Sequence, residues 1–177
     1  MGNFTNILYV VLVSTIRMSV PMILASTGAA FSVRSGVMAL GCEGMMIVGA
    51  FFGVLGSFLT GSPWIGIGFG ILFGVLISLI HATLDVKYKV NQTLSGMSVN
   101  LLGAAVAPLL LQLIWNSKGI SPKVAAFGKL NIGWLSKIPL IGRILGEQNI
   151  LFYITLIIVA VGYIFMFKTP QGLRMRM

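Results

Sequence analysis

The sequence predicts an all-α integral membrane protein with about five transmembrane helices, and three observations carry this prediction. Of the 177 residues, 57% are hydrophobic and only 8% are charged. The mean hydropathy is +1.01. Five apolar runs each approach the ~20 residues that a helix needs to cross a bilayer. Because a soluble domain has about 25% charged residues, this chain could not cover an aqueous surface.

The predicted spans lie near residues 7–31, 37–59, 64–84, 94–115 and 150–167. The first run is too long for the apolar core of a signal peptide, and no positive charge precedes it, so we expect it to remain as a helix. Pro21 removes the hydrogen bond that the Arg17 carbonyl would accept, which predicts a bend. Arg17 either faces the bundle, where Glu43 is a candidate partner, or extends its side chain to one interface.

Glu43 lies in the second run, in a chain with only two other acidic residues, Asp85 and Glu147. An ionised carboxylate is costly in hydrocarbon, so we expect Glu43 to face the bundle interior or a water-filled path. Transport is therefore the first hypothesis. The second run also contains glycines that either allow close helix packing or interrupt the helix, so this helix is either continuous or broken: Gly36, Gly41, Gly44, Gly49, Gly53 and Gly56.

The connection between the third and fourth spans contains Lys87 and Lys89, and the positive-inside rule predicts that it is cytoplasmic. His81 and Asp85 lie four residues apart at the end of the third span, and we expect a solvated pair at the interface. Three amide side chains follow that could contact a polar solute, namely Asn91, Gln92 and Asn100. For Asn100, hydrogen bonding between helices is the simpler alternative.

The segment 116–149 is too long and polar for a tight turn, and several Gly and Pro residues interrupt it. Its apolar residues predict a loop that lies on the membrane surface or caps the mouth of a bundle.

The net charge of +9 comes from Lys and Arg between or beyond the apolar runs. This pattern favours contact with anionic membrane lipid over nucleic-acid binding. The numbers of Lys and Arg residues on the two predicted sides of the membrane are too similar to decide the orientation of the chain.

Neither catalysis nor metal binding by this chain is expected. It lacks the GxxxxGK[ST], GxSxG and HExxH motifs, so neither ATP hydrolysis through that loop nor hydrolytic catalysis is indicated. One cysteine, Cys42, and one histidine, His81, form no cluster with the spacing of metal ligands. We therefore predict a protein that is not an enzyme and that has no metal and no cofactor.

Three segments carry a family resemblance: SVRSGVMALGCEGMMIVGAFFG (32–53), VNQTLSGMSVNLL (90–102) and KTPQGLRMR (168–176). Together with Arg17 and Pro21, they resemble the permease subunits of bacterial ABC importers for simple sugars and nucleosides, and the nucleoside branch most closely. The resemblance implies a multi-pass protein of the bacterial cytoplasmic membrane. It also implies a cytoplasmic ABC ATPase, a second permease subunit and an external substrate-binding lipoprotein as partners.

The resemblance further implies that 116–149 is external and that 168–177 begins the region that couples to the ATPase. Residues that match this coupling motif are Thr169, Gly172, Leu173 and Arg176. The candidates for lining or shaping the substrate pathway are Glu43, Asn91, Gln92, Asn100 and Arg17. The chain departs from the family at Val33 and Ala39, where polar residues are common, and relatives continue well beyond Met177. We therefore expect residues 1–177 to be the amino-terminal portion of one permease domain.

Two other functions stay open at this point. A permease for branched-chain amino acids also lacks its own ATPase, although the EGMM and NQTLSG segments favour the nucleoside branch. A non-transporting membrane scaffold or small channel would use the glycine-rich helices only for assembly.

Overall fold

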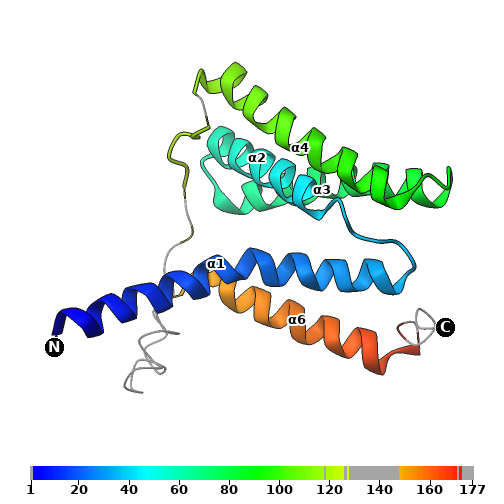
Figure 1. Cartoon of the computed structure of the whole chain (residues 1–177). Helices are drawn as coiled ribbons and strands as arrows, with labels where there is room; N and C mark the ends of the chain where they lie inside the picture. The colour runs from blue at the N-terminus through cyan, green and yellow to red at the C-terminus, as the bar shows by residue number, and fades with distance from the viewer. Residues whose placement is uncertain (1, 118, 126, 128–147, 171, 173–177) are drawn as a thin grey trace. The chain divides into compact units, whose positions relative to one another are not determined.

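The computed structural model describes residues 2–117, 119–125, 127, 148–170 and 172, with side chains from residue 7 onward. The described part contains five helices and no strand (Figure 1). They are α1 (Gly2–Arg34), α2 (Cys42–Thr60), α3 (Pro63–Val86), α4 (Gln92–Trp115) and α6 (Ile150–Lys168). All five are long and apolar enough to cross a membrane. The prediction of an all-α membrane protein with five spanning helices is confirmed.

The chain divides into two compact units. Unit 1 consists of Met1–Gly28 and Phe127–Met177, and unit 2 consists of Ala29–Ala126. Most of α1 and all of α6 therefore belong to unit 1, whereas α2, α3 and α4 belong to unit 2. Most of the predicted external loop, residues 128–147 in particular, lies outside the described residues.

Helix α1 runs through Pro21 without interruption. Figure 1 shows that the helix changes direction along its length. The helix ends at Arg34, and Gly36, two residues later, has a φ of +89°, a backbone conformation that favours glycine. Gly36 N donates to Val33 O at 3.2 Å, and Val37 N donates to Ser32 O at 3.2 Å. These two bonds form a Schellman motif, which satisfies the last carbonyls of α1.

Helices α2 and α3 form an antiparallel hairpin in unit 2. Gly61 ends α2 with a φ of +66°, and Pro63 begins α3 at a position where its missing N–H costs nothing. Glycines on both helices face each other: a Cβ added at Gly53 would lie 3.4 Å from Gly66 O, and one added at Gly49 would lie 3.3 Å from Gly70 O. The two backbones therefore pack closely, as the small residues of the second span predicted.

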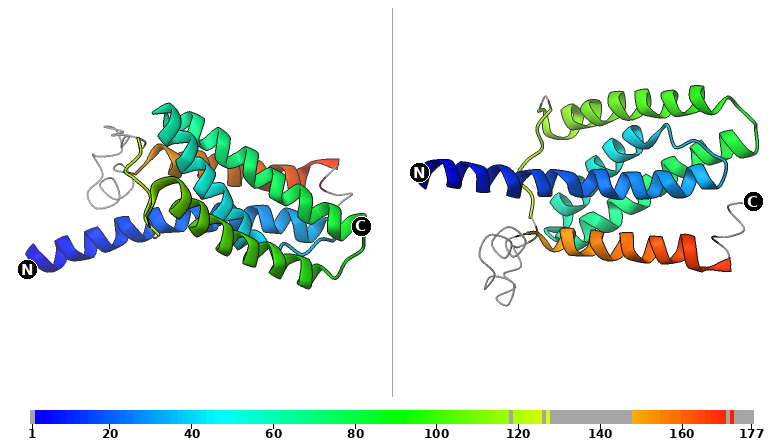
Figure 2. Two further views of the ribbon diagram at one scale, coloured as in Figure 1. Left: turned by 90° about the horizontal axis from the view of Figure 1, so that it is seen from above. Right: turned by 60° about the horizontal axis from the view of Figure 1, so that its bottom comes forward.

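Helix α4 runs parallel to α2 and packs on its other side, as the views of Figures 1 and 2 agree. At the C-terminal end of α4, the Trp115 ring lies edge-on to Phe51 and Phe58 of α2, with centroid separations of 5.9 and 5.5 Å. At the N-terminal end of α2, the contacts are between backbones: a Cβ added at Gly103 of α4 would lie 2.6 Å from the Cα of Gly44. The start of α2 is thus held against the middle of α4.

Candidate functional site

The connection between α1 and α2 is non-helical from Ser35 to Gly41. The prediction that the second span begins near residue 37 is therefore wrong at its start, because the helix begins only at Cys42. The left-handed Gly36 ends α1, and the apolar residues 37–41 then continue as irregular backbone. We call residues 35–41 the entry segment. Such backbone needs hydrogen-bond partners within the protein if it lies at membrane depth.

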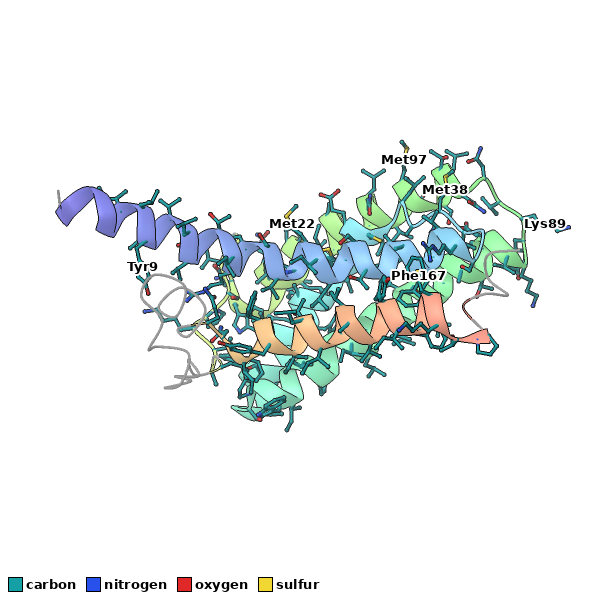
Figure 3. All side chains as sticks on the ribbon, turned by 90° about the horizontal axis from the view of Figure 1, so that it is seen from below. Tyr9, Met22, Met38, Lys89, Met97 and Phe167 are labelled. Atoms are coloured by element: carbon teal, nitrogen blue, oxygen red, sulfur yellow. The ribbon has the colours of Figure 1, made fainter. Side chains whose placement is uncertain are left out.

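Gln92, the first residue of α4, binds the beginning of the entry segment on two sides. Its Oε1 accepts from Met38 N at 3.1 Å, and its Nε2 donates to Gly36 O at 3.2 Å. Figure 3 places Met38 toward the end of this unit at which Lys89 lies, as expected from the position of Gln92 just after Lys89. One amide side chain thus satisfies both a donor and an acceptor of the irregular backbone.

Asn100, about two turns further along α4, binds the end of the entry segment in the same way. Its Oδ1 accepts from Gly44 N at 2.8 Å, and its Nδ2 donates to Leu40 O at 3.0 Å. Gly44 N is one of the amides at the start of α2 that have no partner within the helix. Asn100 therefore acts as a cap supplied by another helix, which is the interhelical role that the sequence had left open.

Small residues on α4 allow this contact. A Cβ added at Gly96 would lie 2.6 Å from the Cβ of Leu40 and 3.1 Å from Gly41 N. A Cβ added at Gly44 would overlap the Val99 carbonyl. The glycine spacing therefore sets how closely the entry segment approaches α4, and only this close approach brings both amide side chains within hydrogen-bonding distance.

Glu43 lies in the first turn of α2 and its side chain is exposed in the single chain. It forms no hydrogen bond or ion pair with the described residues. The positive end of the α2 helix dipole favours a negative charge at this place. Arg17 is also exposed and lies in unit 1, whereas Glu43 lies in unit 2. Their pairing stays a prediction.

The remaining predicted site residues have local partners or lie outside the described part. Asn91 caps α4, because its Oδ1 accepts from Thr93 N at 2.9 Å. In the predicted coupling segment, Thr169 Oγ1 donates to Phe165 O and accepts from Gly172 N at 3.2 Å. The hydroxyl thus turns the chain back onto the end of α6. Leu173 and Arg176 lie outside the described residues.

His81 and Asp85 are buried, so the expectation of a solvated pair at the interface is wrong. Their side chains are only 5% and 0% exposed, and His81 Nε2 lies 3.3 Å from Asp85 Oδ2. His81 Nδ1 lies 2.8 Å from the hydroxyl of Ser95, a residue of α4. The packing of α4 over the end of α3 removes the pair from solvent. The spacing of the two residues within one helix could not reveal this burial.

Within the described ranges, no three His, Cys, Asp or Glu side chains group as metal ligands.

Comparison with known proteins identifies the family. The family model described as "Branched-chain amino acid transport system / permease component" matches residues 11–177. The chain belongs to this permease family. It is 33% identical over 183 residues to the guanosine ABC transporter permease protein NupQ of Bacillus subtilis, covering 98% of this chain and 57% of that protein. No solved structure matches.

A second relative is also a permease of an ABC transporter. The nucleoside ABC transporter permease protein NupC of Lactococcus lactis is 34% identical over 181 residues, again covering 98% of this chain and 57% of that protein. The chain thus spans about half the length of the curated relatives that it matches. The predicted family is confirmed, and the chain is a multi-pass component of the cytoplasmic membrane.

Proposed function

We propose that this chain forms part of the membrane permease of an ATP-driven importer that passes a nucleoside into the cell. The names of two of its relatives support the solute class, since one is a guanosine permease and the other a nucleoside permease. ATP would be hydrolysed by a separate cytoplasmic ABC ATPase. A second permease subunit would complete the pathway, and an external lipoprotein would deliver the substrate.

The entry segment is the structural observation that carries this proposal. Non-helical backbone at membrane depth is tolerated where it is buried in protein or lines a water-filled cavity. Transporters use such interruptions to bring backbone polar groups and helix ends to a solute. Here the non-helical segment directly precedes the start of α2, and two α4 side chains bind its backbone and the first turn of that helix.

The candidate residues then divide into two roles. Gln92 and Asn100 shape the pathway, because both amide groups are engaged with the backbone of the entry segment or of α2. Glu43 contacts the solute, because its exposed carboxylate lies one residue before the amide that Asn100 caps. A carboxylate accepts hydrogen bonds from the hydroxyl and N–H groups of a nucleoside. Asn91 and Arg17 have supporting positions, at the cap of α4 and within α1.

The coupling role of residues 168–177 is part of the same proposal. The Thr169 hydroxyl holds Gly172 at the end of α6, where a Cβ at Gly172 would lie 2.6 Å from Met166 O. We propose that this contact positions the start of the coupling segment for the ATPase and that residues 116–149 face the external lipoprotein.

Uptake by the assembled importer tests the proposal. Cells without their own nucleoside import would express the complete permease that contains this sequence, together with its ATPase, lipoprotein and second permease subunit. We expect ATP-dependent accumulation of labelled guanosine that unlabelled adenosine competes and leucine does not. Competition by leucine instead would favour the amino acid permease, and conductance or stable self-assembly without an ATPase would favour a channel or scaffold.

A further inference from the structure

The buried group formed by His81, Asp85 and Ser95 has no part in the pathway described above. Asp85 lies in the last turn of α3, where the helix dipole disfavours a negative charge. Its side chain is fully buried, and neither carboxylate oxygen has a hydrogen-bond partner among the described residues. A buried carboxylate with so little compensation is costly and calls for a specific role.

The His81 ring connects this carboxylate to α4. One ring nitrogen faces Asp85, and the other lies 2.8 Å from the Ser95 hydroxyl. Nε2 forms no hydrogen bond with the carboxylate at this distance, whereas Nδ1 and the Ser95 hydroxyl are hydrogen-bonded, with the tautomer of the ring deciding which of the two donates. A Ser hydroxyl can either donate or accept, so this bond joins α3 to α4 with either tautomer of the ring.

Ser95 lies on α4 beside the residues that hold the entry segment. Gln92 precedes Ser95 by three residues. Asn100 follows Ser95 by five residues, a separation of about 7.5 Å along the helix axis. The adjacent Gly96 packs on Leu40 and Gly41. Any rotation of α4 that removed Ser95 from His81 would therefore also move the two amide side chains away from the entry segment.

We propose that His81, Asp85 and Ser95 are positioning residues that fix the rotation of α4, and through Gln92 and Asn100 the geometry of the entry segment. Their effect on transport rests on the proposed function, but their effect on the entry segment does not. The three residues contact no substrate. They act through α4, on which Ser95 lies close to Gln92 and Gly96, so changes at Ser95 should be felt at the start of α2.

The accessibility of the Cys42 thiol can be used to measure changes in the entry segment. It is half-buried and immediately follows the segment. In the assembled importer, with any cysteine outside this sequence replaced, the rate at which N-ethylmaleimide modifies Cys42 would be measured without substrate. We expect Ser95→Ala to raise this rate about fivefold, the factor that corresponds to one lost hydrogen bond. Ser95→Thr, which keeps the hydroxyl, should restore it.

Ser98→Ala is the matched control, because Ser98 is also on α4 but its hydroxyl bonds only Leu94 O of the same helix, at 2.8 Å. It should leave the rate unchanged. Asn100→Ala should raise the rate by itself, and adding Ser95→Ala should then have little further effect, since both act through one contact. Rates would be measured only on protein that copurifies with the ATPase, which removes misfolded chains.

An unchanged rate in Ser95→Ala, or fully additive effects of Ser95→Ala and Asn100→Ala, would overturn the proposal. The nucleoside hypothesis is tested separately, because the modification rate requires no transport. In an importer that does take up guanosine, the KM and the maximal rate would also be measured for both serine variants. We expect Ser95→Ala to change them and Ser98→Ala to leave them unchanged.

Discussion

Asn100 Oδ1 accepts from Gly44 N at 2.8 Å, so a side chain in the middle of α4 caps the start of α2. The same amide donates to Leu40 O at 3.0 Å. A single residue thereby satisfies both the last part of the irregular entry segment and the first part of the helix that follows. The arrangement makes the start of α2 dependent on the position of α4.

Replacing Asn100 with Ala should destabilise the permease more than the same change at Asn91. Asn100→Ala leaves two backbone groups without partners, each at a cost of about 1–3 kcal/mol. Asn91→Ala removes one helix cap, which costs about 1 kcal/mol. Unfolding in mixed detergent micelles would measure both variants. Equal losses would show that Asn100 has no more than a capping role.

Gly44→Ala should prevent α2 from packing against α4. The added Cβ would overlap the Val99 carbonyl and would lie 2.8 Å from the Cα of Asn100, and backbone cannot move as a flexible side chain does. We expect a loss of about 3 kcal/mol or more, at the upper end for overpacked cores. Gly74→Ala is the control, because nothing lies within 4 Å of its added Cβ. Similar amounts of folded protein for both variants would contradict the packing described here.

Glu43→Gln should reduce guanosine uptake without affecting folding. The side chain is exposed and forms no bond with the described residues, so the free energy of unfolding should change by no more than about 0.5 kcal/mol. If the carboxylate binds the nucleoside, loss of a charge-assisted hydrogen bond should lower uptake at least about tenfold. Normal expression with unchanged uptake would assign Glu43 to packing at the membrane.

Thr169→Val should weaken coupling to the ATPase. The variant keeps the shape of the side chain but loses the hydroxyl that joins Phe165 O to Gly172 N. We expect lower uptake and a smaller stimulation of ATP hydrolysis by the loaded lipoprotein. Thr155→Val is the control in the same helix, since that hydroxyl bonds only Leu151 O at 2.8 Å. Equal effects of the two variants would argue against a specific role of Thr169.

The sequence by itself determined the environment, the number of spanning helices and the family. Hydropathy follows from composition and run length, and the resemblance depends on residues contiguous along the chain. Sequence also singled out Gln92 and Asn100, because amides are rare enough in apolar spans to be noticed. Of the two roles that the sequence left open for the glycines of the second span, close packing is the one that Gly49 and Gly53 have.

Only the tertiary structure decided what these residues contact. The apolar character of residues 37–41 predicted helix, but the Schellman motif at Gly36 and the two α4 amides favour irregular backbone there. The burial of His81 and Asp85 depends equally on a neighbouring helix that the spacing within α3 does not specify. Partners that are distant in sequence satisfy these polar groups, and hydrogen bonding of that kind has no periodic pattern along the chain.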